Sequence, residues 1–401
     1  MVEVEFVFLI IYVDSSTDSV ASIDQGSNTI NGGKLFYKYC KLVRMFLGKC
    51  GKVILFEAEI DSTSLYKPAI ILNGNPADLY QGLQQRTEAR KANQLGFWRK
   101  ERRIKQLIKV TNLKVLNLRG NNFHGFIPDA FPEACDLETL DLSANRLSGQ
   151  LPRSLANCKA LKFLDVGINR LSGTFPSWLG NMSQLRVLML RSNRFYCPFG
   201  NKGTACNLPL LQIIDISSNK FSGILSEECF STWKAMMVYG EESEYYYQGQ
   251  ILSFSDKIYP DTMAVINKGL DMELEKILTA YTIINFSDNE FGGEIPKIIG
   301  NLWLLRGLNF SRNAFTGPIP STIGNITQLE SLDVSQNKLS GDIPSKLAQL
   351  SSLAVLNLSF NKLEGKIPSG PQFLTFQENS FEGNVGLCGP PMSKLCGNIT
   401  R

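Results

Sequence analysis

The chain has 401 residues, 43% of them hydrophobic, and a formal net charge of +4, so it can bury a sizeable core. The charge is local: the stretch from Arg86 to Lys109 holds nine Lys or Arg against two Glu, with few aromatics, which favours a solvated helix or linker over a nucleic-acid or membrane patch. Because no apolar run approaches the 18 residues of a spanning helix, the sequence predicts no transmembrane segment.

Residues 1–109 show no internal period. Phe6–Val13 is apolar, but Glu3 and Glu5 stand where a signal peptide carries positive charge, so no clear signal peptide is predicted. We expect this segment to be weakly structured or to form a makeshift cap, because the first repeat after it needs a cover for its leucines.

From residue 110 onward a 24-residue skeleton recurs, as in LETLDLSANRLSGQLP, which starts at Leu137. Five copies fall within 110–237 and four within 277–370. Each copy carries one asparagine at the same place: Asn121, Asn145, Asn169, Asn193, Asn219, Asn289, Asn313, Asn337 and Asn361. Such a period predicts a solenoid whose turns stack on one another.

Each residue type of the skeleton has a physical role. In LxxLxLxxN the leucines point inward from a short strand and the residues between them point outward. The asparagine lies where the chain leaves the strand, so its buried amide must bond backbone groups of its own and the adjacent turns, forming a ladder. One turn cannot bury enough surface to fold alone, and its neighbours must supply the rest.

Outward positions that vary on a constant scaffold are where specificity can reside. They make candidate ligand-binding residues of Arg119, Asp141, Phe163, Asp165, Met189, Arg191 and Asp215. These aspartates and Asp333 recur at the same position of the repeat and would form a row of carboxylates. Such a row is conceivable as a site of paired-acid hydrolysis, but we prefer to interpret it as an ordinary solenoid surface.

No enzyme motif is present. The one histidine, His124, lies in a repeat turn, and neither a nucleophile elbow, a metalloprotease helix, a phosphate-binding loop nor a kinase catalytic loop can be found. The nine cysteines show no metal-binding spacing. We therefore expect no catalytic residue, no cofactor and no metal.

An insertion interrupts the repeats. Asn219 and Asn289 are separated by 46 residues more than one period, which we assign to an island at 238–276. It is rich in tyrosine, and Tyr245, Tyr246 and Tyr247 are candidate ligand contacts. Long insertions are usually functional or disordered, and in solenoids they cluster on the binding face.

The remaining cysteines and the glycosylation sequons indicate the compartment. Cys197 and Cys206 bracket a glycine-rich loop and are expected to form a local disulfide, whereas Cys135, Cys158 and Cys229 are expected to be small buried hydrophobes. Candidate glycosylation sites are Asn181, Asn285, Asn309, Asn325, Asn357 and Asn398. Together they favour the secretory route, although Asn285, Asn309 and Asn357 belong to the repeat consensus itself.

The repeat resembles the plant-specific subclass of extracellular leucine-rich repeats, with the consensus LSGxIPxxLGNLxxL over about residues 113–396. The island, entered through ECFSTWKAMM and left through NKGLDMELEKILT, is similar to that of plant receptor-like proteins of the Verticillium-resistance and Cf types. This resemblance implies an α/β solenoid, a right-handed superhelix or horseshoe, with parallel strands on its concave face.

The final segment, 371–401, resembles the C-terminal cap of the same family, and the resemblance implies a Cys388–Cys396 pair. Family members continue into a membrane helix, whereas this chain stops at Arg401, which leaves a truncated receptor or a secreted product open.

The resemblance implies a non-catalytic protein on the extracellular face of the plasma membrane. Such a protein would bind an extracellular peptide, protein or glycan that comes from a pathogen or from the plant's own development, and no nucleic acid. It would signal through a partner receptor kinase that docks on the C-terminal repeats, and plant defence is the setting that we favour. The alternatives are a secreted inhibitor of a cell-wall-degrading enzyme, which lacks an island, and a non-functional fragment.

Overall fold

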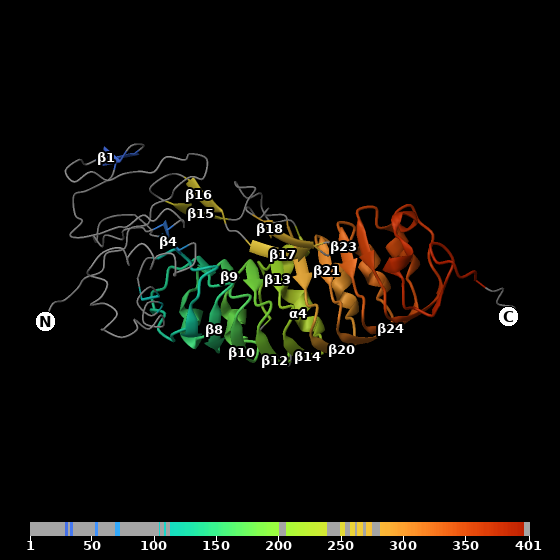
Figure 1. Cartoon of the computed structure of the whole chain (residues 1–401), viewed down its shortest axis with the longest axis horizontal. Coiled ribbons are helices and arrows are strands. Elements are labelled where there is room, and N and C mark those ends of the chain that lie inside the picture. The colour runs from blue at the N-terminus through green and yellow to red at the C-terminus, as the bar shows by residue number, and fades with distance from the viewer. Residues whose placement is uncertain are drawn as a thin grey trace, which may run out of the picture.

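The structure, a computed structural model, describes residues 104, 108–109, 113–199, 206–238 and 281–396 in full. Elsewhere it describes the backbone of eight short strands: β1 (Thr29–Ile30), β2 (Gly33–Lys34), β3 (Val53–Ile54), β4 (Ala69–Leu72), β15 (Gly249–Leu252), β16 (Lys257–Pro260), β17 (Met263–Asn267) and β18 (Leu270–Leu274). The described repeats form one solenoid, coloured from cyan to red in Figure 1.

The first sheet of the solenoid takes one three-residue strand from each of the nine repeats. These nine strands are all parallel and pair at identical repeat positions, so that Asp141 lies beside Asp165. They are β5 (Val115–Asn117), β7 (Thr139–Asp141), β9 (Phe163–Asp165), β11 (Val187–Met189), β13 (Ile213–Asp215), β19 (Ile283–Asn285), β21 (Gly307–Asn309), β23 (Ser331–Asp333) and β25 (Val355–Asn357).

A second parallel sheet, which the sequence pattern did not predict, follows the asparagine of each repeat. Here the pairing is shifted by two residues, because Arg170 lies beside Ser148 rather than Arg146. The strands are β6 (His124–Phe126), β8 (Arg146–Gly149), β10 (Arg170–Gly173), β12 (Arg194–Pro198), β14 (Lys220–Ile224), β20 (Glu290–Glu294), β22 (Ala314–Gly317), β24 (Lys338–Asp342), β26 (Lys362–Lys366) and β27 (Gly386–Cys388).

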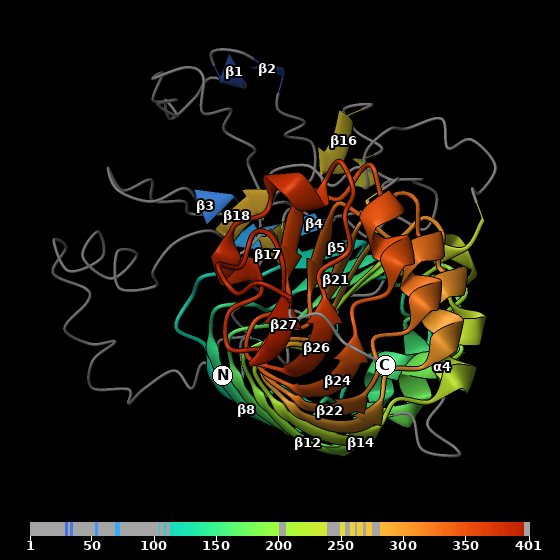
Figure 2. The ribbon, with the colours of Figure 1, turned by 90° about the vertical axis from the view of Figure 1, so that its right-hand side faces the viewer.

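Short helices lie on the third side of most of the described turns, and Figure 2 shows them beside the two sheets when the molecule is viewed along its length. Five of them begin directly after the proline of the repeat, whose fixed φ suits the residue before a helical turn, whereas the helix at Glu227–Thr232 begins after Ser226. The helices are η1 (Arg153–Asn157), η2 (Ser177–Asn181), α4 (Glu227–Thr232), η3 (Lys234–Met236), η4 (Lys297–Asn301), η5 (Ser321–Asn325) and η6 (Ser345–Gln349), with η7 (Phe373–Thr375) and η8 (Glu378–Ser380) in the cap.

The leucine positions of successive turns share one continuous core. Toward the middle of the stack phenylalanines replace leucines, and the rings of Phe221, Phe291 and Phe315 stack in series with centroid separations of 6.5 and 6.2 Å. Because each layer is covered by the next, burial of about 1.5–3 kcal/mol per large side chain accrues only in the stack.

The asparagine ladder lies beside this core. The Asn169 amide nitrogen donates to the carbonyls of Leu142, Val166 and Gly167 at 3.0, 3.1 and 3.1 Å, and its oxygen accepts from the Leu147 backbone nitrogen at 2.9 Å. The same four bonds recur from Asn145 to Asn361. Asn384 in the cap adds a further rung, which the sequence pattern missed because it follows Asn361 by 23 residues.

The residue before each ladder asparagine adopts a left-handed conformation. At eight of the nine turns it is not glycine, as at Ile168 with φ 53° and Phe360 with φ 53°. The neighbouring turn holds this conformation in place, because the backbone nitrogen of Ile168 donates to the Arg191 carbonyl at 2.9 Å.

The start of the stack is extended by residues from the non-repetitive segment. Strand β4 pairs with β5 in parallel and β3 pairs with β4 in antiparallel orientation, so the first sheet continues past the first repeat. The side chains of Ile104 and Ile108 are buried in the same core as Leu113. Most of the basic stretch from Arg86 to Lys109 lies outside the described residues.

The described residues contain three disulfides, and two of them correct the sequence analysis. Cys135 is bonded to Cys158, and Cys206 to Cys229, each across 23 residues. Cysteines about one turn apart in the sequence lie next to each other on adjacent turns, and the Cα atoms of the two pairs are 4.6 and 4.8 Å apart. The predicted Cys197–Cys206 disulfide is therefore wrong, and so is the prediction that Cys135, Cys158 and Cys229 are unbonded hydrophobic residues. Cys197 is free. Cys388 is bonded to Cys396 in the cap.

The ladder makes a direct prediction about stability. Replacing Asn169 with Ala leaves buried backbone groups without partners, and we expect the free energy of unfolding to fall by about 3 kcal/mol. Arg170→Ala, at the exposed next position, should cost no more than about 0.5 kcal/mol. Urea unfolding midpoints followed by circular dichroism compare the two variants, and equal midpoints would contradict the ladder's role.

Candidate recognition face

The outward residues of the first sheet form its outer face, which we call the first-sheet face. Every candidate ligand residue that the structure describes lies there. These side chains point outward as predicted, and Arg119 is half-buried. The other six are buried: Asp141, Phe163, Asp165, Met189, Arg191 and Asp215. Six of the seven candidates are therefore covered on this face, and their role in ligand binding stays a prediction.

The recurring Asp and Asn of the strands have a local structural role. The Asp141 carboxylate accepts from the backbone nitrogen and hydroxyl of Ser143 at 2.9 and 2.6 Å. Asp165 accepts likewise from the backbone nitrogen of Gly167 at 2.8 Å, and Asp333 from that of Ser335 at 2.9 Å. This second row of side-chain bonds shapes the turn that leads into the ladder asparagine.

Burial changes the protonation of these acids. Burial, with the neighbouring Asp141 charge adding to it, raises the pKa of Asp165 to about 8, against the opposing bond from Gly167 and the charges of Arg191 and Arg119. Because the folded-state pKa of Asp165 is raised above the ordinary value of 3.8, its contribution to stability is fully present below that value and is lost as the pH rises toward about 8. Burial also raises the pKa of Asp215, opposed by Ser217, Arg191 and Asn285.

A separate apolar cluster lies on the first-sheet face, on the opposite side of the sheet from the core. It comprises Phe163, Val187, Met189, Ile213 and Ile283, with Tyr281 packed against it. Val187, Met189 and Ile213 are fully buried although they point away from the core. Because these side chains do not pack in the core, the groups that they contact lie on the outer side of the first sheet.

The hairpin formed by β17 and β18 is placed near this cluster. Its strands pair in antiparallel register from Met263 opposite Leu274 to Asn267 opposite Leu270. In Figure 1 it is drawn beside the first sheet near β13 and β21, and Figure 2 shows it on the side of that sheet away from the helices. The candidate contacts Tyr245, Tyr246 and Tyr247 lie outside the described residues.

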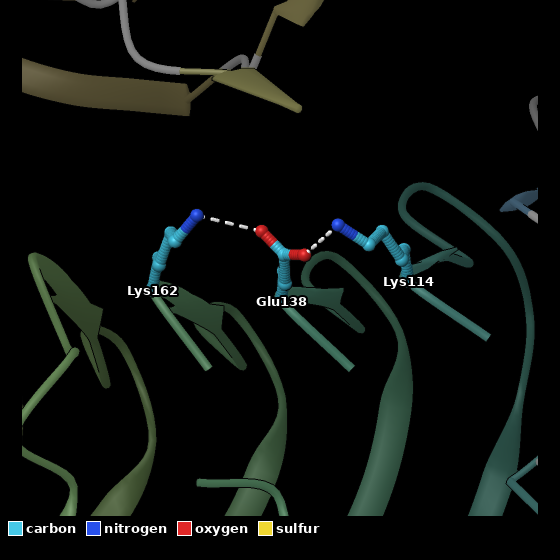
Figure 3. Close-up of polar contacts among 3 residues, drawn as sticks. All are labelled: Lys114, Glu138 and Lys162. Atoms are coloured by element: carbon cyan, nitrogen blue, oxygen red, sulfur yellow. Dashed lines mark hydrogen bonds and ion pairs between the residues drawn. The ribbon is translucent and has the colours of Figure 1, made fainter. Parts of the chain in front are cut away.

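A row of charges runs along the start of the first-sheet strands. Glu138 lies between Lys114 and Lys162 of the two adjacent turns and forms an ion pair with each, at 2.6 Å to the Lys162 ammonium (Figure 3). Burial alone would raise the pKa of Glu138, but the hydrogen bonds and charges of both lysines outweigh it and lower that pKa. The row links three turns of the stack electrostatically.

The described residues show no arrangement suited to catalysis or metal binding. His124 is exposed on the second sheet, where its register partner is Arg146 rather than an acid. Among the residues described, no three His, Cys, Asp or Glu side chains gather as metal ligands would. The recurring aspartates are committed to backbone bonds in their own turns.

The chain matches family models described as leucine-rich repeats at residues 111–171 and at 304–326, 328–350 and 352–374. Receptor-like protein 19 from Arabidopsis thaliana is 58% identical over 212 residues, 52% of this chain and 21% of that protein. Receptor-like protein 18 from the same plant is 59% identical over 208 residues, covering 52% and 24% of the two chains. The chain belongs to the plant leucine-rich-repeat receptor-like proteins. It spans about a fifth to a quarter of the length of these relatives.

Solved structures resemble this receptor-like protein in fold. The ectodomain of the receptor kinase GASSHO1/SCHENGEN3 from Arabidopsis thaliana, solved with CASPARIAN STRIP INTEGRITY FACTOR 2, is 29% identical with a TM-score of 0.54, covering 73% of this chain and 32% of that one. The peptide hormone receptor RGFR1 in complex with RGF2 is 26% identical with a TM-score of 0.50, covering 71% and 41%. A plant ice-binding protein, 23% identical with a TM-score of 0.55 over 73% and 79% of the chains, shares the fold alone.

The glycosylation candidates of the receptor-like protein differ in accessibility. Asn181 and Asn325 are exposed at the ends of η2 and η5. Asn285 is 1% exposed and its amide donates to Asp215 at 3.1 Å, so its side chain is not accessible in the folded chain. Asn309 and Asn357 are half-buried and bonded to Ser311 and Ser359, and Asn398 lies outside the described residues. Within the described part, no helix is both long and apolar enough for a bilayer crossing.

The ion pairs of Glu138 predict a pH-dependent stability. Because its folded-state pKa lies below the ordinary value of 4.5, the stabilisation is present above that value and is lost as the pH falls through the folded-state pKa. We expect Glu138→Gln to lower the free energy of unfolding by about 1–2 kcal/mol at neutral pH and by much less at about pH 3. Unfolding midpoints at both pH values measure this, with the exposed Glu290→Gln as control. A penalty for Glu138→Gln that does not change with pH would be the contrary result.

Proposed function

We propose that this chain is the recognition part of a receptor-like protein, which binds an extracellular peptide or protein ligand on the first-sheet face and has no catalytic activity of its own. The ligand is of pathogen or developmental origin, and plant defence is the setting we favour. The observation that carries the proposal is the apolar cluster of Phe163, Val187, Met189, Ile213 and Ile283, which is buried on the outward side of the first sheet, apart from the core.

Two further observations support this use of the face. The ectodomains of GASSHO1/SCHENGEN3 and RGFR1 were solved in complex with CASPARIAN STRIP INTEGRITY FACTOR 2 and with RGF2. Burial of the first-sheet face is also uneven: toward the C-terminus Asn309, Asp333 and Asn357 are only half-buried, as Arg119 is at the other end. A ligand would reach the face at these less covered turns, beside the β17–β18 hairpin.

Position-specific crosslinking tests the ligand face. A photoreactive residue in place of Arg119 or Asp333 should capture peptides from apoplastic fluid or pathogen culture filtrate, since both positions are partly accessible on the first-sheet face. The same residue in place of Trp303, 56% exposed after η4 on the helical side, should capture none of them. Mass spectrometry identifies the adducts. Capture at Trp303 as efficient as at the other two positions would rule out a ligand site on the first-sheet face.

A partner receptor kinase docks, in our proposal, on the C-terminal repeats. Exposed apolar side chains gather there: Phe360 is 50% exposed and Val385 88% exposed. Gly383, two residues before Val385 in the chain, lies next to Phe360, because a Cβ on Gly383 would stand 2.6 Å from the Phe360 ring. The Lys394 ammonium bonds the Val385 carbonyl at 2.6 Å, which brings Leu395, also exposed, to the same place. Such a patch favours a protein partner.

The docking patch yields a test with a matched control. Phe360→Asp together with Val385→Asp should weaken co-precipitation of the chain with leucine-rich-repeat receptor kinase ectodomains by about tenfold or more, since it buries charge in an apolar contact. Ile168→Asp alters an exposed apolar residue at the same repeat position and φ, but far from the patch, and should have no effect. If Ile168→Asp weakens co-precipitation equally, the patch is not the docking site.

A further inference from the structure

The outer face of the second sheet carries a row of cations, which we call the basic strip. Its members are Arg146, Arg170, Arg194 and Lys220, the first residues of β8, β10, β12 and β14. All four side chains are exposed. Within the described part of the chain, the ion pairs involve other residues and none of the four. The strip thus offers four consecutive unpaired charges.

The strip is also free of nearby carboxylates on its own sheet. The strands from β6 to β14 contain no Asp or Glu. Farther along the same sheet, Lys338, Lys362 and Lys366 are interspersed with Asp342 and Glu364, and β20 carries Glu290 and Glu294. The positive charge is therefore a property of the first five turns rather than of the repeat in general.

Hydroxyl groups and rings lie between the cations. The two-residue shift of the second sheet places Ser148 beside Arg170, Ser172 beside Arg194 and Tyr196 beside Lys220. Tyr196 is exposed, and so is Phe126 at the start of the strip. The Phe126 ring lies over Gly149, where a Cβ would stand 2.3 Å from it, so glycine leaves the space in which the ring lies.

The geometry of the sheet sets the spacing of the charges. Neighbouring strands are about 4.8 Å apart, and a shift of two residues adds about 6.6 Å along the strand, so successive cation Cα atoms are about 8 Å apart. The strip is one cation wide, and the next outward residues, Gln150, Thr174 and Pro198, are uncharged. A partner must therefore be linear, regularly charged and able to bond hydroxyl groups.

We propose that the basic strip binds a linear acidic polysaccharide, a chain of uronic-acid sugars running across the strands along the solenoid. The guanidinium and ammonium groups would pair with its carboxylates. The serine and tyrosine hydroxyls would bond the sugar hydroxyls, and Phe126 and Tyr196 would offer their faces to the sugar rings. The strip lies on a different sheet from the first-sheet face, so this binding is independent of the ligand site proposed above.

Other polyanions fit the strip less well. A nucleic acid strand carries one charge per about 3.4 Å, so most of its phosphates would face no cation of this strip. A membrane surface favours a broad basic patch rather than a row one residue wide. The three disulfides of the described part also indicate an oxidising, extracellular setting, in which an acidic polysaccharide is a more accessible polyanion than nucleic acid.

The experiment measures binding of the full chain to polygalacturonic acid and to the same polymer fully methyl-esterified, at low and at high salt. The test variant is Arg146→Gln with Arg170→Gln and Arg194→Gln. The control variant, Lys338→Gln with Lys362→Gln and Lys366→Gln, removes the same charge from the same sheet. All six side chains are exposed, and circular dichroism with unfolding midpoints checks that both variants keep the fold.

We expect the wild-type chain to bind the acidic polymer and not the esterified one, more weakly as salt rises. The test variant should bind at least about tenfold more weakly, and the control variant within about twofold of the wild type. Absence of wild-type binding, equal loss in both variants, or equal binding of the esterified polymer would overturn the proposal. So would tighter binding to double-stranded DNA or to phosphatidylserine vesicles than to polygalacturonic acid.

Discussion

The rest of the structure depends on the buried amide of the ladder asparagines. Each amide must satisfy three carbonyls and one backbone nitrogen from its own and a neighbouring turn, as Asn169 does with Leu142, Val166, Gly167 and Leu147. A buried group without partners is costly, so this requirement fixes the distance and register between turns. The two parallel sheets, the shared core and the bonding of the left-handed residue before each asparagine all follow from that register.

The same requirement limits where recognition can reside. The turn that presents the asparagine is held by the carboxylate or amide four residues before that asparagine, so Asp141, Asp165 and Asp333 are committed to the backbone nitrogens two residues after them. The outward position two residues earlier in the strand has no such bond and varies: it holds Phe163, Val187 and Ile213. Met189 stands where the neighbouring turns have an aspartate, and it joins these residues in an apolar cluster apart from the core.

The charges are distributed unevenly between the faces of the solenoid. On the first sheet Glu138 forms ion pairs with Lys114 and Lys162, and Arg306 forms one with Glu330, so these charges neutralise one another. On the second sheet the first five turns carry cations alone, whereas the later turns carry both signs. One scaffold thus presents a buried apolar face and an exposed basic one, and the two can serve different partners.

Much of the fold could be predicted from the sequence because its determinants are local and periodic. The 24-residue spacing, the inward leucines and the ladder asparagines from Asn121 to Asn361 all follow from strand geometry and from the bonding needs of one amide. The outward direction of Phe163 and Asp165 follows in the same way. Family membership rests on these motifs and on the relatives that share them.

The contacts between neighbouring turns could be known only from the tertiary structure. That Cys206 bonds Cys229 rather than Cys197 depends on which side chains meet across adjacent turns, since the nearer partner in sequence is not the nearer one in space. Whether an outward residue is exposed depends on what covers it, so Met189 and Arg194 differ although both point away from the core. The two-residue shift that spaces the basic strip likewise arises only when one turn is laid on the next.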